Sequence, residues 1–230
     1  MSDKTYIPRL YGRQIDKPLK PRQAQLMETL LPRLAIPMEE PAKGAIDPQE
    51  LFPQAEEIHL EVGFGGGEHL AWQAAHNPKI GFIGAEPFVN GVAKLLVHVD
   101  EGRQENIRIH HGDVRPLIEA LPDASLARIY VLHPDPWPKK RHHKRRMISP
   151  WFFAQAARLL KSGGELRVAS DIRDYIRWTL MHAQQASEFE WTATCAADWK
   201  KRPGDWPQTR YEAKSLREGR TPAYLVFRRK

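Results

Sequence analysis

The 230-residue chain is 41% hydrophobic, which is enough to form the core of one α/β domain with a short extension. The formal net charge of +7 favours a polyanionic partner such as nucleic acid or an anionic membrane surface, although a basic surface can also serve solubility alone. The single cysteine, Cys195, excludes an intrachain disulfide and a cysteine-based zinc site, and it indicates a reducing compartment.

Two features of the sequence bear on its location. Residues 1–14 lack the apolar core of a signal peptide. No apolar run approaches the roughly 18 residues that are needed to span a bilayer. We therefore expect a soluble, cytoplasmic protein without a membrane partner.

The N-terminal quarter of the chain differs from the rest. Residues 1–20 are basic and aperiodic, which predicts a mobile arm, and residues 21–35 carry leucines at helical spacing. Residues 37–54 are rich in proline, glycine and acids, and we interpret them as a connecting loop. The chain is accordingly divided into a basic arm with a helical extension, 1–54, and a main domain, 55–230.

Short apolar runs alternate with amphipathic segments from residue 57 onwards. The apolar runs predict five strands, at 57–63, 80–86, 107–113, 127–133 and 165–171. The amphipathic segments predict five helices, at 67–77, 88–100, 114–121, 149–161 and 172–186. Five strand–helix units in succession indicate a parallel sheet with helices on both faces. Two final antiparallel strands are expected around an irregular segment, 196–222.

An acidic residue stands at the carboxyl end of each of the five predicted strands. Ligands of open parallel sheets bind beyond these ends. Taken singly, each acid is more simply explained as a helix N-cap or a solvated loop residue. Five together would repel one another unless a cationic or donor-rich ligand lies among them. The acids are Glu61, Glu86, Asp113, Asp135 and Asp171.

The first predicted strand runs into the glycine-rich stretch "EVGFGGG", in which Gly63, Gly65 and Gly67 allow sharp turns and close backbone approach to a ligand. The dinucleotide fingerprint requires a third glycine where Glu68 stands, which disfavours NAD, and a phosphate-binding P-loop motif is absent. A cofactor with an adenosine, no phosphate and its own positive charge fits best, and S-adenosylmethionine has that pattern.

For three of the strand-end acids we expect a separate contact with the cofactor. Glu86 lies at the distance from the glycines that is typical of a carboxylate binding ribose hydroxyls. Asp113 is expected at the amino group of the adenine, and Glu61 near the ammonium of the methionine end.

The stretch 133–146, "HPDPWPKKRHHKRR", places one carboxylate in a proline-stiffened turn beside a basic run. His133 and Asp135 each precede a proline and are expected to be extended. Trp137 could stack on a base or fill the core. Since no acid occurs between Asp135 and Glu165, the basic run has no local counterions, which favours nucleic-acid phosphates. The histidine pairs lack a second ligand pair, so we expect no metal.

These residues together resemble the bacterial tRNA (guanine-N7)-methyltransferase family, within the class I S-adenosylmethionine-dependent methyltransferases. "LEVGFGGGEHL" and "GAEP" are similar to its first two cofactor motifs, and "PDPWPKKRHHKRR" is similar to its most specific signature. "SD" at 170–171 and "TRYE" at 209–212 resemble two further motifs. The resemblance covers roughly 55–230. It departs at His133, where an aromatic is usual, at Ser170, where threonine is usual, and in the sequence after "TRYE".

The resemblance implies a Rossmann-like α/β fold with a mostly parallel seven-stranded sheet. It implies S-adenosylmethionine as cofactor and methyl transfer to N7 of a guanine in the variable loop of tRNA. Cofactor contacts are implied at Glu61, Glu86, Asp113 and Asp135. Substrate contacts are implied at Lys139, Asp171, Thr209, Arg210, Tyr211 and Glu212, and RNA contacts at Arg141, His142, His143, Lys144, Arg145 and Arg146.

The chemistry of the acceptor gives Asp135 a catalytic role. Guanine N7 has an in-plane lone pair and no proton to lose, so it needs no strong general base. Positive charge moves from sulfur to the purine, and a fixed carboxylate such as Asp135 would stabilise it. Asp171 and Glu212 would accept hydrogen bonds from the guanine edge.

Two other functions stay open. One is methylation of an exocyclic amine of another nucleic acid or protein, because the Asp-Pro turn is related to that of such enzymes. The other is a non-catalytic RNA-binding protein with a relic cofactor fold. Either a monomer or a homodimer is compatible with the sequence.

Overall fold

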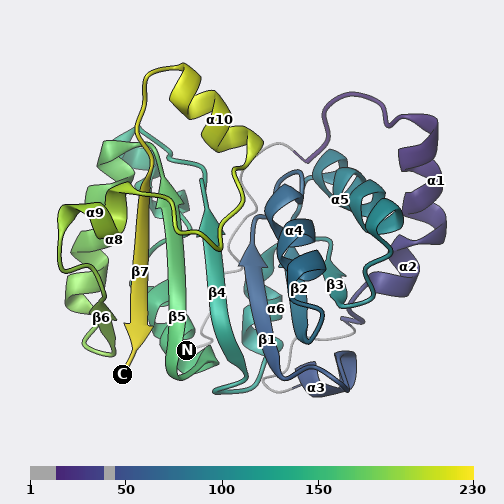
Figure 1. The fold of residues 1–230 in the computed structure, drawn as a ribbon, viewed down its shortest axis with the longest axis horizontal. Helices are drawn as coiled ribbons and strands as arrows, with labels where there is room; N and C mark the ends of the chain where they lie inside the picture. Colours follow the sequence, from purple (N-terminus) through teal and green to yellow (C-terminus); the bar gives the residue numbers. More distant parts are fainter. Residues whose placement is uncertain (1–13, 39–44) are drawn as a thin grey trace, which may run out of the picture.

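The computed structural model describes residues 14–38 and 45–230. In this part of the chain, seven strands form one sheet in the order β3-β2-β1-β4-β5-β7-β6 (Figure 1). Strand β7 runs antiparallel to both neighbours, and the other pairs are parallel, which confirms the expected mostly parallel sheet. The strands are β1 (Glu57–Val62), β2 (Ile80–Ala85), β3 (Ile107–His110), β4 (Leu126–Leu132), β5 (Leu160–Ser170), β6 (Phe189–Trp191) and β7 (Ala223–Arg229).

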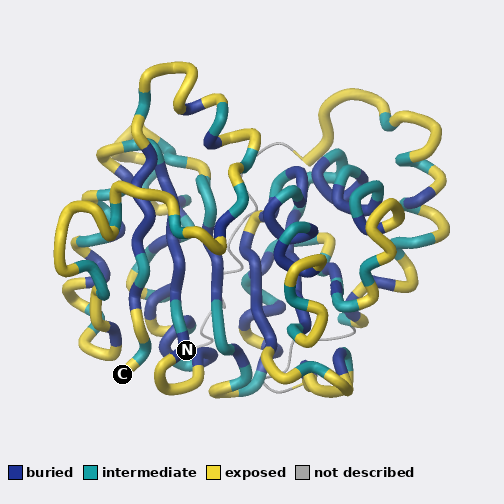
Figure 2. The backbone as a smooth tube through the Cα atoms, in the orientation of Figure 1, coloured by how far each residue is buried: buried dark blue, intermediate teal, exposed yellow. Residues whose placement is uncertain are grey.

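Helices cover both faces of the sheet, and each face has its own apolar core. Figure 2 shows that much of the central strands is buried between these layers. On one face α4 and α5 pack against the strands, with α1 and α2 beside them; on the other lie α6, α7 and α8. The helices are α1 (Pro21–Thr29), α2 (Leu31–Leu34), α3 (Pro48–Leu51), α4 (Glu68–His76), α5 (Val89–Gly102), α6 (Val114–Ala120), the 3-10 helix η1 (Lys140–Arg145), α7 (Pro150–Leu159), α8 (Arg173–Gln185), α9 (Ala196–Lys200) and α10 (Arg210–Arg217).

Three helices lie where the sequence predicted loop. Helix α3 interrupts the predicted loop 37–54, because Asp47 caps it through the N–H of Gln49 and Pro48 suits its first position. Helices α9 and α10 lie inside the segment 196–222 that was expected to be irregular, so that expectation is wrong.

The N-terminal segment is attached to α5. The N–H of Val89 donates to the carbonyl of Gln14 at 2.9 Å, and the side-chain amide of Asn90 donates to the carbonyl of Lys17 at 2.7 Å. Residues 1–13 of the expected mobile arm lie outside the described residues. The division of the chain at residue 54 stays a prediction.

The sheet register brings the ends of the parallel strands together. Val62 pairs with both Ala85 and Val131, so the residues that follow β1, β2 and β4 emerge side by side. Helix α10 lies at the same edge of the sheet (Figure 1). A Cβ at Gly91 would come within 2.3 Å of the carbonyl oxygen of Gly65, so glycine lets α5 approach the loop after β1.

Candidate active site

A cavity of about 370 Å³ opens at this edge of the sheet. Its walls come from the ends of β1, β2 and β4, from the start of α6 and from α10. Gly67 does not line it: a Cβ there would lie 2.7 Å from Leu95, so this glycine serves helix packing. The residues expected from the sequence that do line it are Glu61, Gly63, Gly65, Glu86, Asp113, Asp135, Arg145, Thr209 and Tyr211.

Glu86 is clamped by the backbone. Its two carboxylate oxygens accept the N–H groups of Gly65, at 2.7 Å, and of Phe88, at 2.9 Å. Burial raises the pKa of Glu86 despite these two hydrogen bonds, and the nearby carboxylates of Asp135 and Glu61 raise it further. A hydroxyl or cationic ligand would relieve this cost.

Glu61 is fixed by a histidine. The carboxylate is buried, and one oxygen lies 2.7 Å from Nδ1 of His69, itself buried in the first turns of α4. Gln73, one turn further along α4, lies 3.3 Å from the other ring nitrogen of His69. The direction of the Glu61 carboxylate is therefore set before any ligand binds.

Asp113 combines two roles. One oxygen accepts the N–H of Arg115 at 3.1 Å and so caps α6, and the other lies 2.7 Å from the Arg115 guanidinium. The simple explanation of a strand-end acid as an N-cap is correct here. The same side chain still lines the cavity, so an adenine amino group would share the carboxylate with Arg115.

The turn after β4 carries Asp135 into the cavity wall. Among the described residues its carboxylate has no hydrogen-bond or ion-pair partner. Although the residue is reachable from solvent, the surrounding protein raises the pKa of Asp135 by desolvation. His133 has a φ of 50° and is not extended, which corrects the expectation for this residue.

Trp137 lies in the wall of the cavity and belongs to neither apolar core. The guanidinium of Arg145 lies 4.9 Å from its ring centroid, and the ring of His142 meets it edge-on at 5.9 Å. The structure therefore excludes the core option for Trp137. Base stacking stays a prediction.

The basic run divides into an exposed part and a buried residue. Lys139, Lys140, Arg141 and Lys144 are exposed, as phosphate contacts require. Arg146, by contrast, is only 3% exposed: it donates to the carbonyl of Pro136 at 2.9 Å and pairs with the carboxylate of Asp174.

The guanidinium of Arg146 also lies between aromatic rings, 5.4 Å from that of Tyr175 and 5.0 Å from that of Trp178. The expected RNA contact at Arg146 is therefore wrong. Its role is to hold the turn that carries Asp135, because one of its hydrogen bonds ends on that turn.

Four of the expected substrate residues lie outside the cavity lining, namely Lys139, Asp171, Arg210 and Glu212. Asp171 lies 2.5 Å from Arg220. Burial alone would raise the pKa of Asp171, but the hydrogen bond from Arg220, together with further hydrogen bonds and the charge of His133, lowers it. Glu212 is buried and accepts the hydroxyl of Tyr224 at 2.6 Å. Both carboxylates are already engaged within the protein.

Several lining residues carried no signal in the sequence. Phe88, Arg115 and Met147 belong to none of the motifs, and their place in the cavity follows only from the fold. The "TRYE" motif did contain a structural signal: Thr209 accepts the N–H of Glu212 at 3.2 Å and caps α10. A threonine three residues before a glutamate is a typical helix start.

Neither a membrane-spanning helix nor a metal cluster occurs in the described part of the chain. Within it, no helix is long and apolar enough to cross a bilayer. No group of three or more histidine, cysteine or acidic side chains is placed to hold a metal ion within 14–38 and 45–230.

Solved structures share this fold. The aminoglycoside resistance methyltransferase NpmB1 aligns with a TM-score of 0.53 at 17% identity, over 82% of this chain and 98% of its own. The 16S rRNA methyltransferase KamB aligns with a TM-score of 0.54 at 14% identity, over 82% and 99%. At this identity they show the fold alone, a Rossmann-like methyltransferase fold.

Relatives in sequence show the family. A family model described as "Putative methyltransferase" matches residues 55–225. The tRNA (guanine-N(7)-)-methyltransferase of Rhodospirillum rubrum is 52% identical over 96% of this chain and 88% of its own length. The enzyme of that name from Rhizobium meliloti is 51% identical over 95% and 94%. With these matches and with the carboxylate-lined cavity at the sheet edge, the chain belongs to the tRNA (guanine-N7)-methyltransferase family of S-adenosylmethionine-dependent enzymes.

Proposed function

We propose that this chain transfers the methyl group of S-adenosylmethionine to N7 of a guanine in the variable loop of tRNA. The observation that carries the proposal is the carboxylate of Asp135 in the cavity wall, unpartnered among the described residues and next to an exposed basic run. The names of the relatives support the acceptor, since they are tRNA (guanine-N(7)-)-methyltransferases. Those names do not say which guanine of the tRNA is methylated, so its position in the variable loop is part of the proposal alone.

The residues of the cavity fit the cofactor. When bound, S-adenosylmethionine supplies an electrophilic methyl group on a positively charged sulfur. Glu86 would bind the ribose hydroxyls, since both its oxygens are held in direction by backbone N–H groups. Glu61 would face the ammonium, and Asp113 the amino group of the adenine. Gly63 and Gly65 line the cavity and let the backbone pass close to the ligand.

Asp135 acts by charge in this mechanism. The N7 lone pair needs no base, and the purine becomes positive as it takes the methyl group. A carboxylate that no described residue neutralises, on a backbone fixed by prolines and Arg146, would stabilise that charge in the transition state. The raised pKa of Asp135 reflects the desolvation that also strengthens such an interaction.

Recognition of the guanine edge falls to Asp171 more than to Glu212. Asp171 has one oxygen on Arg220 and the other 3.6 Å from His133, a residue that lines the cavity. Glu212 is buried beneath α10, where Tyr224 and Arg202 contact the same oxygen. We therefore assign Glu212 to anchoring α10 instead of binding the base.

The exposed residues of the basic run would bind tRNA phosphates and position the base, which must leave its stack to reach the cofactor. Lys139, Arg141 and Lys144 are placed for this, with His142, His143 and Arg145 partly exposed beside them. A cytoplasmic location and a monomeric or homodimeric state stay predictions.

Identification of the methylated nucleoside tests the proposal. The protein is incubated with unmodified tRNA and S-adenosylmethionine carrying a labelled methyl group, and the tRNA is digested to nucleosides. We expect the label in 7-methylguanosine. Label in a nucleoside methylated on an exocyclic amine would favour the alternative enzyme. No label, together with no thermal stabilisation by the cofactor, would favour a non-catalytic RNA-binding protein.

A further inference from the structure

Tyr211 differs from the other residues of the "TRYE" motif in where its side chain lies. It lines the cofactor cavity although the residue is 55% exposed. Its ring lies against the glycine-rich loop: a Cβ at Gly65 would meet Cε2 of Tyr211 at 3.2 Å. The ring therefore closes the cavity on the side of α10, directly over the first cofactor motif.

Three carboxylates lie near enough to Tyr211 to act on its phenol by charge. Burial raises the pKa of Tyr211, and although Arg210 opposes the shift, the nearby charges of Glu86, Glu68 and Asp135 raise the pKa further. The phenol thus stays neutral at neutral pH, and its ring lines a cavity whose other lining residues include Glu61, Glu86 and Asp135. An aromatic ring set among carboxylates favours a cation as its ligand.

Helix α10 is held firmly enough to keep the ring there. At its start the guanidinium of Arg210 lies 3.3 Å from the carboxylate of Glu68, across the loop after β1. Within its first turn Glu212 accepts the hydroxyl of Tyr224, which belongs to β7. The position of the Tyr211 ring between these two anchors is built into the fold.

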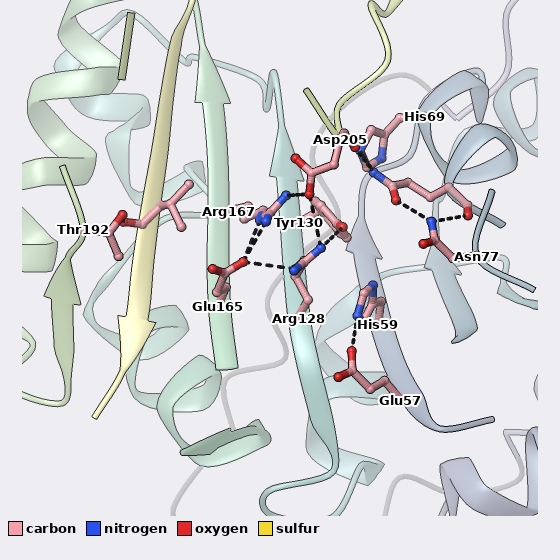
Figure 3. A network of polar contacts seen from close by, with 12 residues as sticks. Glu57, His59, His69, Asn77, Arg128, Tyr130, Glu165, Arg167, Thr192 and Asp205 are labelled. Atoms are coloured by element: carbon pink, nitrogen blue, oxygen red, sulfur yellow. Dashed lines mark hydrogen bonds and ion pairs between the residues drawn. The ribbon is translucent and has the colours of Figure 1, made fainter. Parts of the chain in front are cut away.

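The loop that leads into α10 is anchored on the sheet by a polar network (Figure 3). The carboxylate of Asp205 lies 2.6 Å from Arg167 of β5, and its carbonyl accepts from the side chain of Gln73 at 2.6 Å. Gln73 contacts His69, which contacts Glu61. The anchor of α10 and a carboxylate of the cavity are therefore parts of one network.

We propose that Tyr211 binds the sulfonium of S-adenosylmethionine through a cation–π contact, and that its target is the cofactor instead of the guanine. The cofactor has two cationic groups, and Glu61 suits the ammonium because it is fixed deep in the cavity by His69. Tyr211 lines the same cavity as Asp135, the candidate catalytic residue, and is close enough for the charge of Asp135 to act on its phenol. The inference rests on the cofactor of the proposed function and is independent of the acceptor.

The test compares two ligands that differ only in the charged methyl-sulfonium. S-adenosylhomocysteine keeps every other group of the cofactor and is neutral at sulfur. Titration calorimetry should show that Tyr211→Leu loses about tenfold in affinity for S-adenosylmethionine and less than about twofold for S-adenosylhomocysteine. Tyr211→Phe, which keeps the ring, should retain most of the wild-type preference.

Leu216→Ala is the matched control. Leu216 is an exposed residue of the same helix, 47% exposed, and does not line the cavity. This variant should bind both ligands like the wild type, which separates the ring contact from the general order of α10. Thermal unfolding of all three variants checks that they fold.

Three outcomes decide the inference. Equal losses for the two ligands in Tyr211→Leu would mean that the ring contributes shape alone, and would overturn it. Unchanged cofactor affinity with a raised KM for tRNA would place Tyr211 on the guanine, and would also overturn it. Charge discrimination through Tyr211 in a protein that methylates another base would support the inference while contradicting the proposed function.

Discussion

The carboxylates at the two halves of the cavity are held in opposite ways. At the ends of β1 and β2, Glu61 and Glu86 have fixed partners, a histidine for one and two backbone N–H groups for the other. At the end of β4, the carboxylate of Asp135 has no partner among residues 14–38 and 45–230. Partners give direction to a group that binds a ligand, whereas an unpartnered charge remains available to a reaction.

The backbone of the turn after β4 is held in place, although the carboxylate of Asp135 itself has no partner among the described residues. Arg146 donates to the carbonyl of Pro136, so a buried cation fixes the backbone next to the carboxylate without neutralising it. The basic run therefore has two roles. Its last residue, Arg146, supports the turn from inside, and its exposed residues face solvent.

Removing the charge of Asp135 should give the largest effect. In Asp135→Ala we expect the single-turnover rate of methyl transfer to fall by about 100-fold or more, since the carboxylate stabilises the positive charge that develops on the purine in the transition state. Binding of tRNA, measured separately by fluorescence, should stay near the wild-type value. Asp135→Asn should be nearly as slow, and a fast Asn variant would argue against an electrostatic role.

Changing Glu86, whose carboxylate already has partners in the protein, should reduce cofactor binding instead of the rate of methyl transfer. Glu86→Gln places an amide group against one of two N–H donors and removes the charge, so cofactor affinity should fall by about 10- to 100-fold. Glu119→Gln, on the exposed side of α6, is the control and should bind normally. A Glu86→Gln protein with intact cofactor affinity would contradict the role of Glu86 in cofactor binding.

Arg146→Ala should be a stability variant. Removing its hydrogen bond to Pro136, its pairing with Asp174 and its packing against Trp178 should lower the free energy of unfolding by about 2–3 kcal/mol. For a chain of this length that corresponds to a Tm lower by about 5–10 °C. Lys144→Ala, in the same run but exposed, should leave Tm unchanged. Equal Tm values for the two variants would contradict the buried role.

The pH dependence of cofactor binding follows from Glu86. Its folded-state pKa is raised, so at low pH the group is protonated in both states and costs nothing, and stability falls as pH rises through that pKa. Ribose hydroxyls donate strong hydrogen bonds to Glu86, and so offset this cost, only when the carboxylate is charged. The thermal shift produced by S-adenosylmethionine should therefore be larger at pH 7.5 than at pH 4.5. A larger shift at acid pH would show that Glu86 does not carry its charge toward the ligand.

The smallest effect is expected at the exposed cations. Arg141→Ala combined with Lys144→Ala should weaken tRNA binding several-fold and reduce the slope of log K against log salt by about 0.7–0.9 for each phosphate that the protein no longer neutralises. Lys161→Ala, an exposed lysine at the opposite end of β5, should change neither quantity. An unchanged slope in the double variant would place the RNA elsewhere.

The sequence was sufficient for the sheet because its buried parallel strands are short, mostly apolar runs that alternate with amphipathic helices. The end of each run then located the acids, and Glu61, Glu86, Asp113 and Asp135 do line one cavity. The exposed part of the basic run was predictable for a related reason, since no acid lies nearby in the sequence to pair with it.

What could not be predicted depends on contacts between distant residues. Arg146 looks like its neighbours in the sequence, and only the packing of α8 against η1 buries it between Tyr175 and Trp178. Glu212 looks like a base-binding residue until β7 brings Tyr224 within 2.6 Å. Both cases arise because a local pattern cannot show which face of an element meets another element.

The most direct test of methyl transfer to N7 removes the acceptor atom itself. A tRNA is prepared in which the target guanine of the variable loop is replaced by 7-deazaguanine, which has a C–H group in place of N7 and keeps the N1–H and amino edge. The account predicts that this tRNA binds with unchanged affinity and accepts no methyl group, while the unmodified tRNA is methylated. Methyl transfer to the substituted tRNA at the normal rate would contradict it.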